Sequence, residues 1–277
     1  MTQSSSVKSM KHEKFFRTHP VFTSAELAAY LASTRTTGER TKEALLAYHR
    51  KAGHLLLLRR GLYAVVPPGA DPARFQVDPY LLAARLADDA VLAYHTALEF
   101  HGRAYSVYNQ FTYVASHPTS PLSVGSQSFR GVRPPRALRN TGRQGFGVAT
   151  ADRAGMDIHV TSFERTLVDV LDRPDLTGSW EEIWRSLELV EFFNLDRAIE
   201  YAALLNNATT AAKLGFYLEQ HREQLMVDEQ HLKNIETLVP RHPHYLDRRR
   251  REPGRLIARW NLVVPPEVLS RSWEEVL

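Results

Sequence analysis

The order of three local signals between residues 19 and 66 constrains the fold most strongly. His19-Pro20 ends a helix, because the residue before a proline avoids the helical region. Thr23 and Glu26 have the spacing of a capping box, in which each side chain accepts a hydrogen bond from the other residue's backbone N–H. A helix is therefore expected over about residues 24–32. Two apolar runs around a glycine-containing turn then predict a β-hairpin.

Two further helices are expected around these signals. Residues 7–18 are predicted to form a first helix with its aromatic side chains inward. A second capping box, Thr36-Thr37-Gly38-Glu39, opens a third helix that ends at Gly53. The hairpin comprises residues 54–58 and 62–66, with Arg59-Arg60-Gly61 between them. Three helices followed by a hairpin is the order of a winged helix-turn-helix.

The third predicted helix has two different faces at about 100° per residue. The stripe expected to pack on the other helices comprises Thr41, Leu45, Tyr48 and Ala52. The opposite face carries Thr36, Glu39, Arg40, Glu43, Ala47 and Arg50, and Lys42 and His49 lie on the flanks.

This opposite face has the chemistry of a DNA-reading helix. An α-helix fits the major groove, where an arginine pairs with the guanine edge and a glutamate accepts from the cytosine amino group. Arginines of a wing contact phosphates or the minor groove. The residues predicted to bind DNA are Thr36, Thr37, Arg40, Lys42, Glu43, Arg50, Arg59 and Arg60. The same pattern also fits an ordinary solvated surface of mixed charge, with Arg40 and Glu43 as an i,i+3 pair.

The net charge is unevenly distributed. Residues 1–66 hold 11 Lys and Arg against four acidic residues, a net charge of +7. The whole chain carries +4, so the remainder is mildly acidic. A basic module joined to an acidic one is expected where only one part meets a polyanion.

The composition changes after residue 70, which predicts a winged helix-turn-helix domain at 1–70 and an α+β domain at 71–277. Asp78-Pro79 opens a short helix, and another is predicted over 91–101. Strands of a small antiparallel or mixed sheet are expected at 109–115, 126–132, 145–149 and 156–160. Helices are expected near 162–171, 180–192, 195–205, 208–220 and 228–239. The predicted fold class is α+β.

Two arginine clusters in the second part form a candidate secondary basic surface, which could contact phosphates or an acidic partner. The first cluster comprises Arg130, Arg133, Arg136, Arg139 and Arg143. The second comprises Arg241, Arg248, Arg249, Arg250, Arg251, Arg255 and Arg259. Solvated turns remain the alternative interpretation.

Signals for catalysis are absent from the sequence. The chain has no cysteine, which excludes disulfides and thiolate metal sites, and it has no Walker, GxSxG, HExxH or GxGxxG motif. We expect no enzyme activity, no cofactor and no metal site. The polar N-terminal segment and the lack of an apolar run of about 18 residues predict a cytoplasmic, nucleoid-associated protein with no membrane partner.

Several longer motifs lie beyond this first module. Arg60-Gly61-Leu62-Tyr63 closes the hairpin, and the later motifs are Tyr94-His95-Thr96-Ala97-Leu98, His101-Gly102, Thr166-Leu167-Val168-Asp169, Asp172-Arg173-Pro174, Lys213-Leu214-Gly215-Phe216-Tyr217-Leu218-Glu219 and Trp260-Asn261-Leu262-Val263-Val264-Pro265. Together, over about residues 15–265, they resemble the AbiEi-type antitoxins of abortive-infection (type IV) toxin–antitoxin systems.

The resemblance implies a winged-helix antitoxin that represses its own operon by binding inverted repeats in operator DNA. It also implies that the protein counteracts a nucleotidyltransferase-like toxin, directly or functionally. In that family the C-terminal part is associated with antitoxicity and helps DNA binding.

Two other functions stay open. The winged helix could target a nuclease or nucleotidyltransferase, in which Asp169 and Asp172 would be the carboxylates for magnesium. It could also serve only protein contacts, because a fold does not fix a function.

Overall fold

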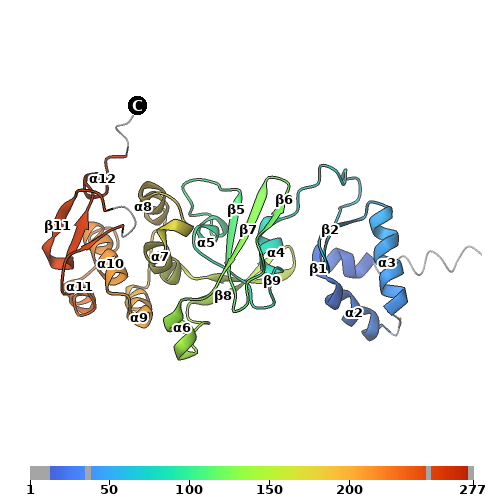
Figure 1. The fold of residues 1–277 in the computed structure, drawn as a ribbon, viewed down its shortest axis with the longest axis horizontal. Helices are drawn as coiled ribbons and strands as arrows, with labels where there is room; N and C mark the ends of the chain where they lie inside the picture. Colours follow the sequence, from blue (N-terminus) through green and yellow to red (C-terminus); the bar gives the residue numbers. More distant parts are fainter. Residues whose placement is uncertain (1–12, 35–38, 248–250, 274–277) are drawn as a thin grey trace, which may run out of the picture.

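The computed structural model describes residues 13–34, 39–247 and 251–273, and the side chains of Glu39 and Arg40 lie outside this description. The chain is a mixed α/β protein whose described strands form three sheets. Three regions follow one another along the longest axis (Figure 1). They are a small first region, a central region built on a six-stranded sheet, and a mainly helical third region.

The first region begins with a helix through residues 13–18. It continues with β1 (Val21–Thr23), α2 (Ser24–Ser33), α3 (Glu39–Lys51), β2 (Leu55–Arg59) and β3 (Leu62–Val65). The three strands form an antiparallel sheet in the order β1-β3-β2. The predicted hairpin is therefore present, and β1 adds a strand that the sequence pattern did not indicate.

The local signals at the ends of these elements act as expected. The backbone N–H of Thr23 donates to Glu26 Oε2 at 2.6 Å, and that of Glu26 donates to Thr23 Oγ1 at 3.2 Å, so the capping box at the start of α2 is confirmed. Gly53 follows α3 with a φ of 75°, a conformation that favours glycine. The second predicted box depends on residues 36–39, whose side chains lie outside the described part of the chain.

An aromatic core holds the first region together. Its buried members are Phe15, Phe16, Phe22, Leu27, Leu31, Leu46, Leu55 and Tyr63. Phe22 packs edge-on against Phe15, with ring centroids 5.1 Å apart, and stacks on Tyr63 at 5.6 Å. Such pairs add about 0.5–1.5 kcal/mol each beyond the area that they bury. Because α3 enters this core through Leu46, the core fixes the rotation of α3 about its axis.

The central region is a mixed sheet in the order β6-β7-β5-β4-β9-β8. Its strands are β4 (Val91–Leu92), β5 (Gln110–Val114), β6 (Leu122–Val124), β7 (Gln127–Val132), β8 (Val148–Arg153) and β9 (Met156–Thr161). The pairs β5–β7 and β4–β9 are parallel, and the other pairs are antiparallel. Three short helices accompany the sheet: α4 (Pro79–Ala84), α5 (His95–Phe100) and α6 (Arg136–Thr141).

Two predictions for this region are wrong. The helix expected over 91–101 is a strand, β4, followed by α5, because Val91 and Leu92 pair with β5 on one side and β9 on the other. Tyr94, with a φ of 58°, separates the two elements. The strand expected at 145–149 starts at Val148 and runs to Arg153, paired along its length with β9. At β4, pairing with distant strands outweighs the local pattern, whereas the extent of β8 is set by its pairing with the next strand of the same hairpin.

The third region begins with helices close to the predicted positions. They are α7 (Phe163–Asp172), α8 (Trp180–Glu188), α9 (Leu195–Leu205), α10 (Ala208–Gln220) and α11 (Glu229–Glu236), of which α8 ends earlier than expected. A small sheet then follows in the order β10-β12-β11. Its strands are β10 (His244–Tyr245), β11 (Arg255–Ile257) and β12 (Leu262–Val264), and α12 (Pro266–Ser270) comes last. The sequence pattern did not predict this sheet.

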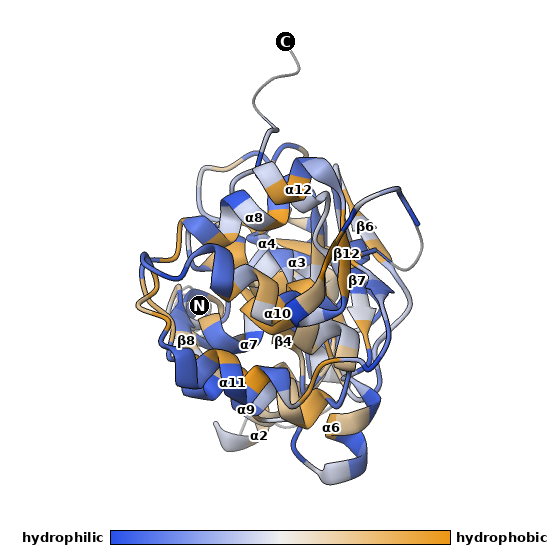
Figure 2. Ribbon diagram, turned by 90° about the vertical axis from the view of Figure 1, so that its left-hand side faces the viewer, coloured by the Kyte–Doolittle hydropathy of each residue, from blue (hydrophilic) through white to orange (hydrophobic). Residues whose placement is uncertain are grey.

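The helix α10 is the core of the third region. Its residues from Thr209 to Leu218 are all buried, and it lies near the middle of the end-on view in Figure 2. At Gly215 the helix is in close contact with Trp260, because a Cβ there would lie 2.4 Å from the indole ring. The segment before β12 therefore closes the helical core.

The first region packs directly on the central region. Val21 and Leu62 share a buried core with Leu81 of α4. Arg59 Nη2 donates to the backbone carbonyl of Leu86 at 2.7 Å. The β2–β3 hairpin is therefore held against the central region by apolar packing and by a side-chain hydrogen bond.

Candidate nucleic-acid interface

One face of α3 is buried and the other is open to solvent. Leu46 is 6% exposed, and Lys42, Leu45 and His49 are half-buried beside it. The His49 ring packs edge-on against Phe16, with ring centroids 5.0 Å apart. The exposed face of α3, as far as its side chains are described, comprises Thr41, Glu43, Ala44, Ala47, Tyr48, Arg50 and Lys51.

This rotation differs from the predicted one. Thr41 and Tyr48 were expected to face the core, but both are exposed, Tyr48 to 65%. His49 was expected on a flank and instead packs on the core. The helix carries two consecutive leucines, and Leu46 is the more deeply buried of the two, so the true apolar stripe is displaced from the predicted one.

The predicted DNA-binding residues between positions 36 and 50 fall into three groups. Glu43 and Arg50 lie on the exposed face, and neither has an ion-pair partner among the described residues. Lys42 lies on the half-buried side and interacts with other groups, so it is not part of the exposed face. Thr36, Thr37 and the side chain of Arg40 lie outside the described residues.

The two arginines of the hairpin have different surroundings. Arg59 is the last residue of β2, and its guanidinium is directed at the Leu86 carbonyl of the central region. Arg60 occupies the turn and is exposed, with no ion-pair partner in the described ranges. Arg60 is therefore available to an anion, whereas Arg59 joins two regions of the protein.

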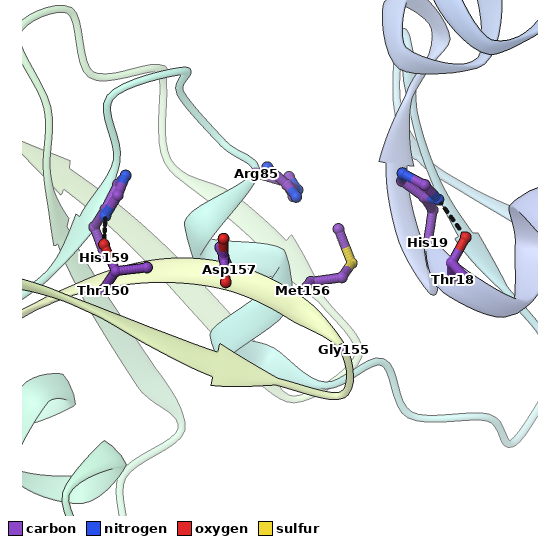
Figure 3. A pocket seen from close by; sticks show the side chains of 8 residues that line it. All are labelled: Thr18, His19, Arg85, Thr150, Gly155, Met156, Asp157 and His159. Atoms are coloured by element: carbon purple, nitrogen blue, oxygen red, sulfur yellow. Dashed lines mark hydrogen bonds between the residues drawn. The ribbon is translucent and has the colours of Figure 1, made fainter.

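A polar cleft of about 540 Å³ lies between the first region and the β8–β9 hairpin (Figure 3). His19 lines one side and His159 the other, with Arg85 between them. Each histidine is hydrogen-bonded to a neighbouring threonine, at 2.9 Å for His19 and 3.3 Å for His159. Arg85 lies 3.6 Å from the Glu26 carboxylate. The lining side chains do not converge on a common point (Figure 3), so the cleft is not a catalytic constellation.

The first arginine cluster lies on the central region and is largely exposed. Arg130, Arg133, Arg136 and Arg139 are exposed, and Arg143 is paired with Glu200 at 3.2 Å. Arg130 lies on β7, and Arg136 and Arg139 lie on α6. Both elements belong to the central region and are separated from α3 along the longest axis (Figure 1).

The second arginine cluster is only partly described. Arg248, Arg249 and Arg250 lie outside the described residues. The guanidinium of Arg259 is paired with three carboxylates: Glu219 at 3.0 Å, Glu229 at 2.5 Å, and Glu236. Each of the three guanidinium nitrogens already donates to a carboxylate, so Arg259 ties the third region together.

Comparison with known proteins gives a fold and no function. Neither a protein-family model nor a curated protein matches this chain. The crystal structure of the Rv2827c protein from Mycobacterium tuberculosis is similar, with a TM-score of 0.60 and 19% sequence identity over 94% of this chain and 92% of that one. The likeness shows a shared fold, and it extends over all three regions.

The motif residues around Asp169 form a buried network. Arg165 Nε donates to Asp169 Oδ2 at 3.2 Å, and the Tyr201 hydroxyl donates to Asp169 Oδ1 at 2.6 Å. Burial and the adjacent Asp169 carboxylate raise the pKa of Tyr201 well above its ordinary value, so the hydroxyl keeps its proton. The network is structural, because Arg165 and Asp169 are each about 1% exposed.

Asp172, the second carboxylate in the alternative of a nuclease or nucleotidyltransferase, also has hydrogen-bond partners within the protein. Asp172 Oδ1 accepts hydrogen bonds from Asn207 Nδ2 at 2.8 Å and from Thr210 Oγ1 at 2.7 Å. This geometry gives no support to Asp169 and Asp172 as a magnesium pair. Within the described ranges, no group of three or more His, Asp or Glu side chains could hold a metal ion. No helix among the described residues is long and apolar enough to span a bilayer.

Proposed function

We propose that the first region is a winged helix-turn-helix that binds duplex DNA through the exposed face of α3. The observation that carries the proposal is the free charge on this region. Arg50, Lys51 and Arg60 are exposed and have no ion-pair partner among the described residues. Such cations can replace the counterions of DNA phosphates, which supplies most of the affinity of non-specific binding.

The shape of α3 supports the same proposal. Its buried side is anchored in the aromatic core by Leu46, so the exposed side is presented in a fixed orientation. Ala44 and Ala47 are small and exposed, which lets the helix backbone come close to the base edges of a major groove. Glu43 and Arg50, from the predicted set, lie on one edge of this face.

We further propose that the protein is an antitoxin and autorepressor. It would bind inverted repeats in its own operator and counteract a nucleotidyltransferase-like toxin, without a cofactor and in the cytoplasm at the nucleoid. The support for this role is the resemblance of the sequence motifs to AbiEi-type antitoxins. In the structure, several of these motif residues are buried, including His95, Asp169 and Lys213.

A gel-shift titration with duplex DNA from upstream of the coding region tests the DNA-binding proposal. The wild type is expected to shift this duplex more tightly than a scrambled duplex, and its affinity is expected to fall steeply with salt. The matched pair of variants is Arg50→Ala, on α3, and Lys233→Ala, an exposed cation on α11. Loss of affinity only in Arg50→Ala supports the proposal. Absence of any salt-sensitive affinity in the wild type contradicts it and favours a module for protein contacts.

Co-expression tests the antitoxin role separately. A nucleotidyltransferase-like gene adjacent to this one is expected to arrest growth when it is expressed alone, and this protein is expected to restore growth. If growth stays arrested although this protein is folded and expressed at a matched level, the antitoxin role is refuted. That result would leave the DNA-binding proposal unaffected.

A further inference from the structure

Tyr48 occupies an unexpected position on the face of α3 that is proposed to meet DNA. Successive residues of an α-helix are about 100° apart, which places Ala44, Ala47 and Lys51 opposite the buried side. Tyr48 lies next to Ala44 at one edge of this face, and Arg50 lies at the other edge. The side chain of Tyr48 is 65% exposed.

The Tyr48 ring packs against one neighbouring ring, and its hydroxyl is left available for binding. It packs edge-on against the His49 ring, with centroids 5.1 Å apart, and His49 is itself packed against Phe16. The Tyr48 hydroxyl has no hydrogen-bond partner among the described residues. A tyrosine has only two side-chain torsions to order on binding, so a supported ring loses little entropy.

The chemistry of this side chain suits base edges better than phosphates. The apolar ring can contact a thymine methyl group, and the hydroxyl can donate to a purine N7 or to a thymine O4. A neutral phenol neutralises no phosphate charge, unlike the arginine and lysine beside it. The contribution of Tyr48 should therefore depend on sequence and hardly at all on salt.

We propose that Tyr48 is a specificity-determining residue of α3 that contacts base edges in the major groove. This inference rests on the proposed DNA-binding function and adds a residue that the sequence pattern assigned to the core. The cations of α3 then supply affinity for any duplex, and Tyr48 supplies preference among duplexes.

The experiment starts from a pool of duplexes with a random central segment, enriched on the wild-type protein. The dominant duplex and a scrambled duplex of the same composition are the two probes. Dissociation constants are measured by fluorescence anisotropy for the wild type, Tyr48→Ala, Tyr48→Phe and Tyr105→Ala. Tyr105 is the matched control because it is also an exposed tyrosine, at 52%, but lies in the central region. Unfolding midpoints verify that the variants remain folded.

Tyr48→Ala is expected to weaken binding to the enriched duplex about tenfold, which corresponds to about 1.4 kcal/mol, and to leave binding to the scrambled duplex unchanged. Tyr48→Phe removes only the hydroxyl, so it shows how much of this loss comes from the hydroxyl and how much from the ring. Tyr105→Ala should change the affinity for neither duplex. An unchanged preference in Tyr48→Ala, or an equal loss on both duplexes, overturns the role of Tyr48. Failure of the wild type to enrich any duplex overturns the proposed function instead.

Discussion

Three cations of the first region are left exposed by the fold, whereas two arginines of the third region are neutralised by it. On α3 and the hairpin turn, Arg50, Lys51 and Arg60 are exposed and unpaired within the described residues. In the third region, Arg165 is buried against Asp169, and Arg259 is surrounded by three glutamates. A run of arginines in a sequence therefore does not by itself indicate a binding surface. What matters is whether the fold supplies partners for them.

Asp169→Ala should produce the largest effect on stability. It would leave the Arg165 guanidinium buried, at 1% exposure, without its carboxylate. Breaking a buried pair in this way costs about 3–5 kcal/mol. Urea unfolding measures the loss, and Asp196→Ala is the control because its side chain is 84% exposed. A loss below about 1 kcal/mol would show that the buried pair does not hold the third region together.

Gly215→Ala should have the next largest effect. The added Cβ would lie 2.4 Å from the Trp260 ring, between two buried elements. Overpacking of this kind costs about 1–3 kcal/mol. The control is Gly145→Ala, where a Cβ would meet nothing within 4 Å. Thermal unfolding is measured for both variants, and Gly215→Ala should have the lower midpoint. Equal midpoints would contradict the close contact between α10 and Trp260.

Arg59→Ala should cost about 1 kcal/mol, because it removes the hydrogen bond to Leu86 between the first and central regions. Arg60→Ala, one residue along the turn, should leave stability unchanged and weaken DNA binding. Unfolding and salt titrations of both variants separate the two roles. The distinction between the two arginines is wrong if Arg59→Ala reduces the salt dependence of DNA affinity as much as Arg60→Ala does.

Local signals in the sequence were sufficient for much of the first region. The Thr23–Glu26 box, Gly53 and the turn at Gly61 depend on neighbours within a few residues, and all three are present as expected. The rotation of α3 about its axis is not determined by neighbouring residues in the sequence. It depends on whether Leu45 or Leu46 packs deeper in the aromatic core. That is why Tyr48 was assigned to the core and is instead exposed.

The missed elements have the same physical origin. β4 consists of two residues between strands that are distant in the sequence, and the sheet of β10, β11 and β12 consists of strands of two or three residues. Segments this short carry almost no periodicity. The hydrogen bond of Arg59 has a related origin, since its partner Leu86 lies 27 residues away in the chain.

The salt dependence of DNA affinity in the double variant Arg50→Ala, Arg60→Ala tests the central claim most directly. Both residues are exposed, so the double variant should stay folded. The control is a second double variant, Arg197→Ala with Lys233→Ala, which removes the same charge from the third region. If both arginines contact phosphates, the slope of log affinity against log salt should fall by about 1.8 in the α3 and turn variant, at about 0.9 per contact. The control should keep the wild-type slope. Equal slopes in the wild type and in both variants would contradict the account.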